Sequence, residues 1–236
     1  MALNNVTTGF PKSVIPDLQN LQANHDAREI TGLSAGSTVD TWADLTDNNR
    51  DQNRADSTTP SYETDEINGN PAVLSDSDYF SDGNYLGNKV SYYLVYKQNG
   101  GDRKTAMATY KGFSDGVEGL NVTFRSGDVQ LQYGDGSDTN TYSETFSGLQ
   151  DGNPHVIGVG VDADGGDAFW NFDGAEVTQN VATTTIDHGD VYLMTQEEET
   201  SRSFDGYQGQ NLIYGAYHDS NTRSDVINNL QDEWGI

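Results

Sequence analysis

The C-terminal stretch 212–236, LIYGAYHDSNTRSDVINNLQDEWGI, decides the fold. Residues 219–222 offer several side chains able to cap a helix N-terminus. Apolar residues then recur at spacings of three and four, which places them on one helical stripe: Val226, Ile227, Leu230 and Trp234. A helix of about three turns is only marginally stable alone. We therefore expect this stripe to dock on a separate hydrophobic core.

The residues before that helix have the pattern of short β-strands. Apolar and aromatic residues alternate with polar ones between turns, and Asp-Gly steps at 164–165 and 173–174 suit tight hairpins. The predicted strands are 38–45, 72–74, 89–97, 104–113, 119–126, 128–136, two or three within 154–177, 191–196 and 205–218. We expect an antiparallel all-β fold, a sandwich or a barrel, closed by the short helix.

The first sixteen residues differ from the rest of the chain. They contain two prolines and little periodicity, so we expect residues 1–16 to form an arm that is ordered by contact with something else. Residues 17–236 are then one sandwich domain, because all-β domains commonly reach this length. The polar tract 46–61 is expected to be a long solvated loop.

The charge is strongly negative: 37 acidic residues against 12 basic ones give a net charge of -25. This balance argues against a nucleic-acid partner, which needs cations at its phosphates. Acidic residues spread over the whole chain are typical of proteins from halophilic organisms, where salt screens their repulsion. The chain has no cysteine, and no 18-residue apolar run that would insert in a membrane.

Five segments in order resemble the laminin G-like, concanavalin A-like family of jelly-roll sandwiches. They are STVDTWADLTDNN, INGNPAVLSDSDYF, VSYYLVYK, HVIGVGVDADGGDAFWNFDG and FDGYQGQNLIYGAYHDSNTRSDVINNLQDEWGI. The resemblance covers 17–236 and implies a jelly-roll β-sandwich. The chain departs from the family at Thr46-Asp47, where Ser-Gly is common, and at Gln210-Asn211, where an Ile and an acidic residue are usual.

The resemblance also sets the expected functions. The N-terminus shows no signal peptide, so the protein either stays in the cell or leaves it by a route such as assembly into a virus particle. We expect a non-enzymatic surface protein of a virus that infects a halophilic archaeon: a decoration, turret or fibre protein. Its arm would bind capsid or tail proteins, its sandwich would bind host surface glycans, and it would form a symmetric homo-oligomer. The alternatives are a secreted or cell-surface carbohydrate-binding protein and a glycoside hydrolase.

The acidic residues supply the catalytic and metal candidates. Hydrolysis of a glycoside needs two facing carboxylates, and Glu63 and Asp65 are the nearest pair, without the third acid of the glucanase branch. We expect no catalytic residues and no enzymatic activity. Asp162, Asp164 and Asp167 have the spacing of calcium ligands, and the alternative is that they are hairpin residues on an acidic surface.

Other reactive side chains are scattered. We interpret the four histidines as non-catalytic: His25, His155, His188 and His218. Four of the five lysines fall within residues 89–111 and could meet an acidic partner or balance neighbouring acids: Lys89, Lys97, Lys104 and Lys111. In the strand 89–97, Tyr92 and Tyr96 are expected to face the core, and Tyr93 to point the opposite way as the freer residue.

Overall fold

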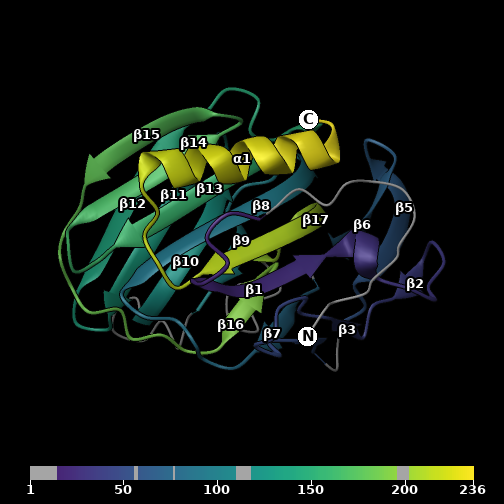
Figure 1. Cartoon of the computed structure of the whole chain (residues 1–236), viewed down its shortest axis with the longest axis horizontal. Helices are drawn as coiled ribbons and strands as arrows, with labels where there is room; N and C mark the ends of the chain where they lie inside the picture. Colours follow the sequence, from purple (N-terminus) through teal and green to yellow (C-terminus); the bar gives the residue numbers. More distant parts are fainter. Residues whose placement is uncertain (1–14, 56–57, 77, 110–117, 196–201) are drawn as a thin grey trace.

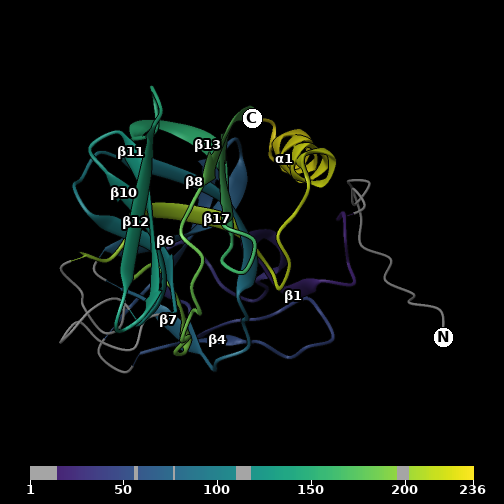
Figure 2. The ribbon, with the colours of Figure 1, turned by 90° about the vertical axis from the view of Figure 1, so that its left-hand side faces the viewer.

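Two antiparallel β-sheets pack face to face in the computed structural model, which describes residues 15–55, 58–76, 78–109, 118–195 and 202–236. Figures 1 and 2 show the two layers and the helix α1 outside one of them. The all-β sandwich with a short C-terminal helix is thus confirmed.

Sheet A contains nine strands. Its order from edge to edge is β15 (Ala175–Asn180), β14 (Asp167–Phe172), β13 (Asp151–Asp162), β8 (Lys89–Asn99), β17 (Asp205–Tyr214), β6 (Asn70–Asp76), β5 (Ser61–Ile67) and β2 (Ser37–Thr38), and β1 (Leu21–Asp26) also pairs with β17.

Sheet B contains eight strands. Its order is β12 (Thr139–Thr145), β11 (Asp128–Asp135), β10 (Glu118–Arg125), β9 (Lys104–Ala108), β16 (Val191–Leu193), β7 (Phe80–Asp82), β4 (Gln52–Arg54) and β3 (Thr41–Trp42). A short 3-10 helix, η1 (Ala27–Glu29), follows β1.

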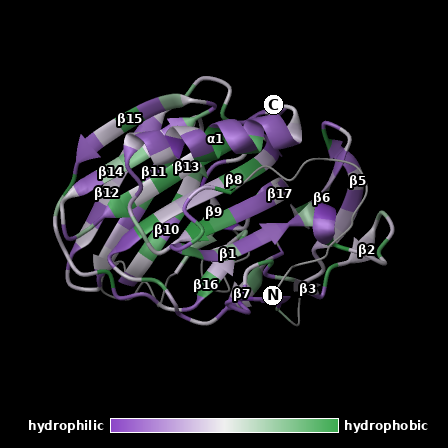
Figure 3. Cartoon of the chain, viewed as in Figure 1, coloured by the Kyte–Doolittle hydropathy of each residue, from purple (hydrophilic) through white to green (hydrophobic). Residues whose placement is uncertain are grey.

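The main core lies between the sheets and is rich in aromatic side chains. Tyr92 and Tyr96 of β8 belong to it, as their alternation predicts. Their hydroxyls donate to Asn211 Oδ1 at 2.6 Å and to the Leu149 carbonyl at 2.8 Å, so burial leaves neither group unpaired. In Figure 3 hydrophobic segments lie along the central strands, whereas most of α1 is hydrophilic.

A second hydrophobic cluster lies between the outer face of sheet A and α1 (Ser220–Trp234). The prediction that Tyr93 is the freer residue is wrong, because this cluster covers it completely and its hydroxyl bonds His218 Nδ1 at 2.9 Å. Gly158 provides the room for this ring: a Cβ there would lie 2.7 Å from Tyr93. The sheet therefore has two buried faces along β8 and β13.

The helix α1 forms as its sequence predicts. Asp219 is the N-cap, and its carboxylate accepts from the Thr222 N–H at 2.8 Å. Gly235 ends the helix in the left-handed conformation, with φ 68°. The predicted stripe is buried throughout: Val226, Ile227, Leu230 and Trp234.

Trp234 near the C-terminal end of α1 is held by polar as well as apolar contacts. Its Nε1 donates to Gln210 Oε1 at 3.0 Å, and the Arg28 guanidinium stacks 4.5 Å from the ring centroid. Gly209 lies under the indole, where a Cβ would be 2.6 Å from a ring carbon. The Gln210 that departs from the family pattern is therefore a structural partner of this tryptophan.

The polar tract 46–61 is not one solvated loop. It contains β4, and Gln52 and Thr58 are buried within it. The strand predicted over 38–45 is divided into β2 and β3. A continuous strand would place Val39 and Trp42 on opposite faces, but both enter the core. Two-residue strands at the sheet edges do not sustain the alternation that the prediction assumed.

The predicted arm 1–16 lies outside the described residues except for its last two. Ile15 packs against the cluster under α1, and the Pro16 carbonyl accepts from the Tyr214 hydroxyl at 3.0 Å. The boundary between arm and domain stays a prediction. Within the described ranges, no helix is both long and apolar enough to span a bilayer.

Candidate functional site

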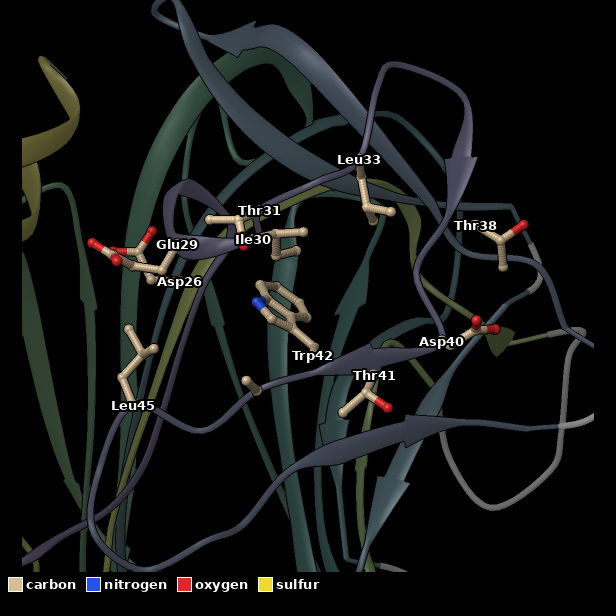
Figure 4. A pocket seen from close by; sticks show the side chains of 11 residues that line it. Asp26, Glu29, Ile30, Thr31, Leu33, Thr38, Asp40, Thr41, Trp42 and Leu45 are labelled. Carbon is tan, nitrogen blue, oxygen red and sulfur yellow. The ribbon is translucent and has the colours of Figure 1, made fainter.

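A pocket of about 340 Å³ opens where β1, η1, β2 and β3 follow one another. This volume is in the range of small-ligand pockets, which is about 300–1,000 Å³. Figure 4 shows Trp42 in the middle of the lining residues, with Asp26 and Glu29 to one side and Asp40 to the other. The lining also includes Ile30, Thr31, Leu33, Thr38, Thr41, Ala43 and Leu45.

Two carboxylates fix the backbone around this pocket. Asp26 caps η1 by accepting from the Arg28 N–H at 2.9 Å. Asp44 accepts from the N–H groups of Asn24, Thr46 and Arg50 at 2.9–3.0 Å. Burial disfavours the charge of Asp44, but these hydrogen bonds, with that of the Thr46 hydroxyl, outweigh burial and lower its pKa. The loop after Trp42 is therefore held by an ionised side chain.

Trp42 carries one of several buried polar atoms that lack a hydrogen-bond partner among the described residues. The residue is fully buried, packs 5.8 Å from the Phe80 ring centroid, and its indole Nε1 has no hydrogen-bond partner among the described residues. A buried N–H without a partner costs free energy, about 1–3 kcal/mol. In Figure 4 the nitrogen lies on the side of the ring that faces Asp26, Glu29 and Leu45. Less than 1 Å² of this nitrogen is solvent-accessible, so a ligand oxygen would reach it only if neighbouring side chains moved aside.

The pocket combines apolar and acidic groups. Leu33 and Leu45 are 38% and 42% exposed, and they are two of the three large hydrophobic residues that stand exposed in the described chain. Asp26 and Asp40 each pair with an arginine, Arg28 and Arg54 respectively. Carboxylates accept hydrogen bonds from hydroxyl groups, and the leucines suit an apolar ring face. These groups together suit an uncharged molecule with many hydroxyls.

A second cavity of about 450 Å³ lies at the end of the sandwich near β13. Asp151 at its rim bonds His155 Nε2 at 3.0 Å, and Asp173 bonds Nδ1 of the same ring at 2.7 Å. The hydrogen bond from His155 lowers the pKa of Asp151 to about 2. Burial of His155 lowers its pKa, but the two carboxylates outweigh burial and raise it. His155 is thus held between two carboxylates beside the cavity, and it forms ion pairs with them when it is protonated.

The other histidines make separate contacts and do not come together. His25 Nδ1 lies 3.1 Å from the Trp42 carbonyl, and burial lowers its pKa. His188 contacts the Thr109 hydroxyl at 2.6 Å, and His218 contacts Tyr93. No group of three or more His, Asp or Glu side chains in the described ranges could hold a metal ion.

The calcium candidates do not converge on one point. Asp162 pairs with Lys89 Nζ at 2.8 Å and accepts from the Gly165 N–H at 2.7 Å, as in an ordinary hairpin turn. Asp164 instead accepts from the Asn88 side chain, and Asp167 pairs in register with Asn180. The turn thus has the geometry of the alternative interpretation, a hairpin on an acidic surface.

Glu63 and Asp65 lie on β5, one strand from an edge of sheet A. Glu63 accepts from the Ser61 hydroxyl at 2.8 Å. Asp65 has a positive φ of 60°, and the register with β6 shifts between Glu63 and Ile67. The irregular backbone breaks the alternation that would direct both carboxylates to one face.

The described lysines of the predicted cluster each lie beside a carboxylate. Lys89 pairs with Asp162, Lys97 with Glu66 at 3.2 Å, and Lys104 with Asp205 at 4.0 Å. Lys111 lies outside the described residues. These pairs fit the interpretation in which the lysines balance neighbouring acids.

No family model matches the sequence, and no curated protein matches it significantly. The fold is similar to domain 4 of AbnA, an extracellular GH43 arabinanase from Geobacillus stearothermophilus, solved in complex with arabinotriose. The TM-score is 0.67 at 15% identity, over 88% of this chain and 98% of that one.

Two larger proteins contain a similar unit. The binding domain of botulinum neurotoxin serotype D gives a TM-score of 0.63 at 9% identity, over 90% of this chain and 51% of that one. The enzymatically active domain of bacteriophage CBA120 tailspike protein 2 gives a TM-score of 0.57 at 16% identity, over 86% of this chain and 33% of that one. Identities this low establish the sandwich fold alone.

Sequence reasoning did not find the pocket. Its lining comes from turns and two-residue strands, which carry no period. The available signal was the segment STVDTWADLTDNN, because it combines a tryptophan with acids and hydroxyls in a short span.

Proposed function

We propose that this protein is a non-enzymatic glycan-binding module and that the pocket around Trp42 receives the glycan. The observation that carries the proposal is a buried indole N–H, without a partner among the described residues, beside a pocket lined by carboxylates, threonines and exposed leucines. Sugar hydroxyls supply both the acceptor that the indole lacks and donors for the carboxylates.

The fold comparisons support the same proposal. The arabinanase domain was solved with arabinotriose, and its fold covers nearly the whole of this chain. Among the described residues, the candidate acids Glu63 and Asp65 lie on an irregular strand and form no evident pair, which favours binding over hydrolysis.

A glycan array tests this function. We expect the wild-type protein to bind a subset of neutral oligosaccharides without releasing any sugar. Trp42→Phe should weaken that binding by about 3- to 10-fold, the worth of one hydrogen bond. Trp170→Phe is the matched control, because Trp170 is also fully buried with an unpartnered Nε1 but lies on β14, away from the pocket. No binding on the array, or equal losses for both variants, would contradict the proposal.

We further propose that the module is exposed on the surface of a virus of a halophilic archaeon, with the arm 1–16 attached to capsid or tail proteins. The net charge of -25 supports a high-salt source, and a tailspike domain is among the proteins with a similar fold. Antibody labelling of purified particles in the electron microscope tests this role. Label on the particle surface is expected, and label confined to host cells would refute it.

A further inference from the structure

Among the strands that the structure describes, β12 forms one edge of sheet B and has β11 as its single neighbour. In the described part of the chain, no backbone hydrogen bond joins residues 140–145 to anything beyond β11. The other described strands with a single neighbour are β2 and β3, of two residues each, and β1 and β15, of six residues each. With seven residues, β12 is the longest edge strand described, and unpaired edges are templates for strand pairing.

The edge has one feature that can hinder pairing, the inward-pointing Glu144, whose carboxylate already bonds Gln179, and it lacks the others. Proteins protect edge strands with lysine, proline or bulges. The sequence of β12, TNTYSET, contains no lysine and no proline, and its register with β11 has no bulge. Its single acid is Glu144, in a chain of net charge -25. A charge of -1 over seven residues is close to the average of the chain, so the charge of β12 neither favours nor excludes a second copy.

The strand is also rigidly presented. On the inner side, Glu144 accepts from the Gln179 side chain and the Tyr142 hydroxyl accepts from the Ala182 N–H at 2.8 Å. On the outer side, Thr141 receives a hydrogen bond from Gln132. The edge needs no reordering before it pairs, so pairing costs little conformational entropy.

The sequence of β12 is complementary to itself. The antiparallel register that overlaps the whole strand is centred on Tyr142. It sets Thr141 opposite Ser143 and Asn140 opposite Glu144 of the second copy. The nearest turn acid, Asp138, then falls level with residue 146, which is a phenylalanine. No two like charges are opposed in this register, whereas a centre at Thr141 would oppose Asp138 to Glu144.

We propose that two copies of this protein associate through β12 about a two-fold axis at Tyr142, so that the two B sheets become one continuous sheet. The partner surface is the same strand of the second copy, as an isologous interface requires. The pocket around Trp42 lies at β3, the opposite edge of sheet B, so both pockets stay open in such a dimer.

Paired charge variants test this register by sedimentation velocity in low-salt buffer. The double variant T141E/S143E places glutamates opposite each other at both symmetric positions, and we expect its dimer dissociation constant to be roughly ten-fold higher than that of the wild type. The matched double variant T141K/S143E places a lysine opposite each glutamate, and it should dimerise at least as well as the wild type. Thr141 and Ser143 are both exposed, and near-ultraviolet circular dichroism checks that each variant folds.

Hydrogen exchange gives a second measurement. Amides of residues 139–145 should exchange more slowly in the wild-type dimer than in T141E/S143E. The proposal would be overturned if the wild type were monomeric or if T141E/S143E left its dimer dissociation constant unchanged. It would also be overturned if T141K/S143E dimerised as weakly as T141E/S143E. A complex of another stoichiometry, in which the β12 amides exchange as fast as in T141E/S143E, would also overturn the proposal.

Discussion

Replacing Gly209 by alanine should destabilise the protein by displacing Trp234. The added Cβ would lie 2.6, 2.7 and 3.1 Å from three carbons of the indole ring. Carbon atoms pack best at about 3.5–4.0 Å, so the ring must move by nearly 1 Å. That movement strains the 3.0 Å hydrogen bond from Trp234 to Gln210 and the stacking of Arg28 on the ring.

The magnitude follows from these contacts. Overpacking of a core costs about 1–3 kcal/mol, and loss of one buried hydrogen bond about 0.5–1.5 kcal/mol. Alanine also lowers the conformational entropy of the unfolded chain, which stabilises the folded state by about 0.4–1 kcal/mol. We therefore expect Gly209→Ala to lower the free energy of unfolding by about 2 kcal/mol, which is about 4–8 °C in melting temperature for a chain of this size.

The assay is denaturant unfolding followed by tryptophan fluorescence. Gly87→Ala is the control, because a Cβ at Gly87 meets nothing within 4 Å. The effect of Gly209→Ala should shrink in a Trp234→Phe background, where the smaller ring leaves room. If Gly209→Ala were as stable as Gly87→Ala, Trp234 would not pack closely on Gly209, and this reasoning would be refuted.

Three further outcomes follow from charge. Raising NaCl from about 0.2 M to about 2 M should raise the melting temperature, because it screens the repulsion among the acids, and a fall would contradict the high-salt interpretation. The pKa of His155 is raised by Asp173 and Asp151 against the effect of burial, so its ion pairs stabilise the fold below about pH 6.5 and are lost as the pH rises through the folded-state pKa. His155→Gln should therefore cost more stability at about pH 5.5 than at about pH 8.5, and an equal cost would refute this. Excess EDTA should leave the melting curve unchanged, because Lys89 already pairs with Asp162, and a lower midpoint would restore the cation hypothesis.

The sequence predicts those parts of the fold that depend on local periodicity. The stripe ending at Trp234 and the cap at Asp219 are local patterns, and both appear as expected. The environment of Tyr93 is not local: the docked helix buries the outer face of sheet A, and the alternation of β8 cannot indicate which face a helix will cover. The pocket depends on how η1 and β3 meet in space, so the sequence alone does not indicate that Trp42 lines a pocket.

The three tryptophans provide the most direct test of the account, because each indole N–H gives its own signal in a ¹⁵N–¹H correlation spectrum. Trp234 Nε1 is bonded to Gln210, Trp170 Nε1 lies in the core, and Trp42 lines the pocket with an Nε1 that has no partner among the described residues. On titration with a glycan that binds on the array, we expect the Trp42 indole signal to shift while the other two stay in place. A bound glycan that leaves the Trp42 signal unchanged would contradict the central claim that this pocket is the binding site.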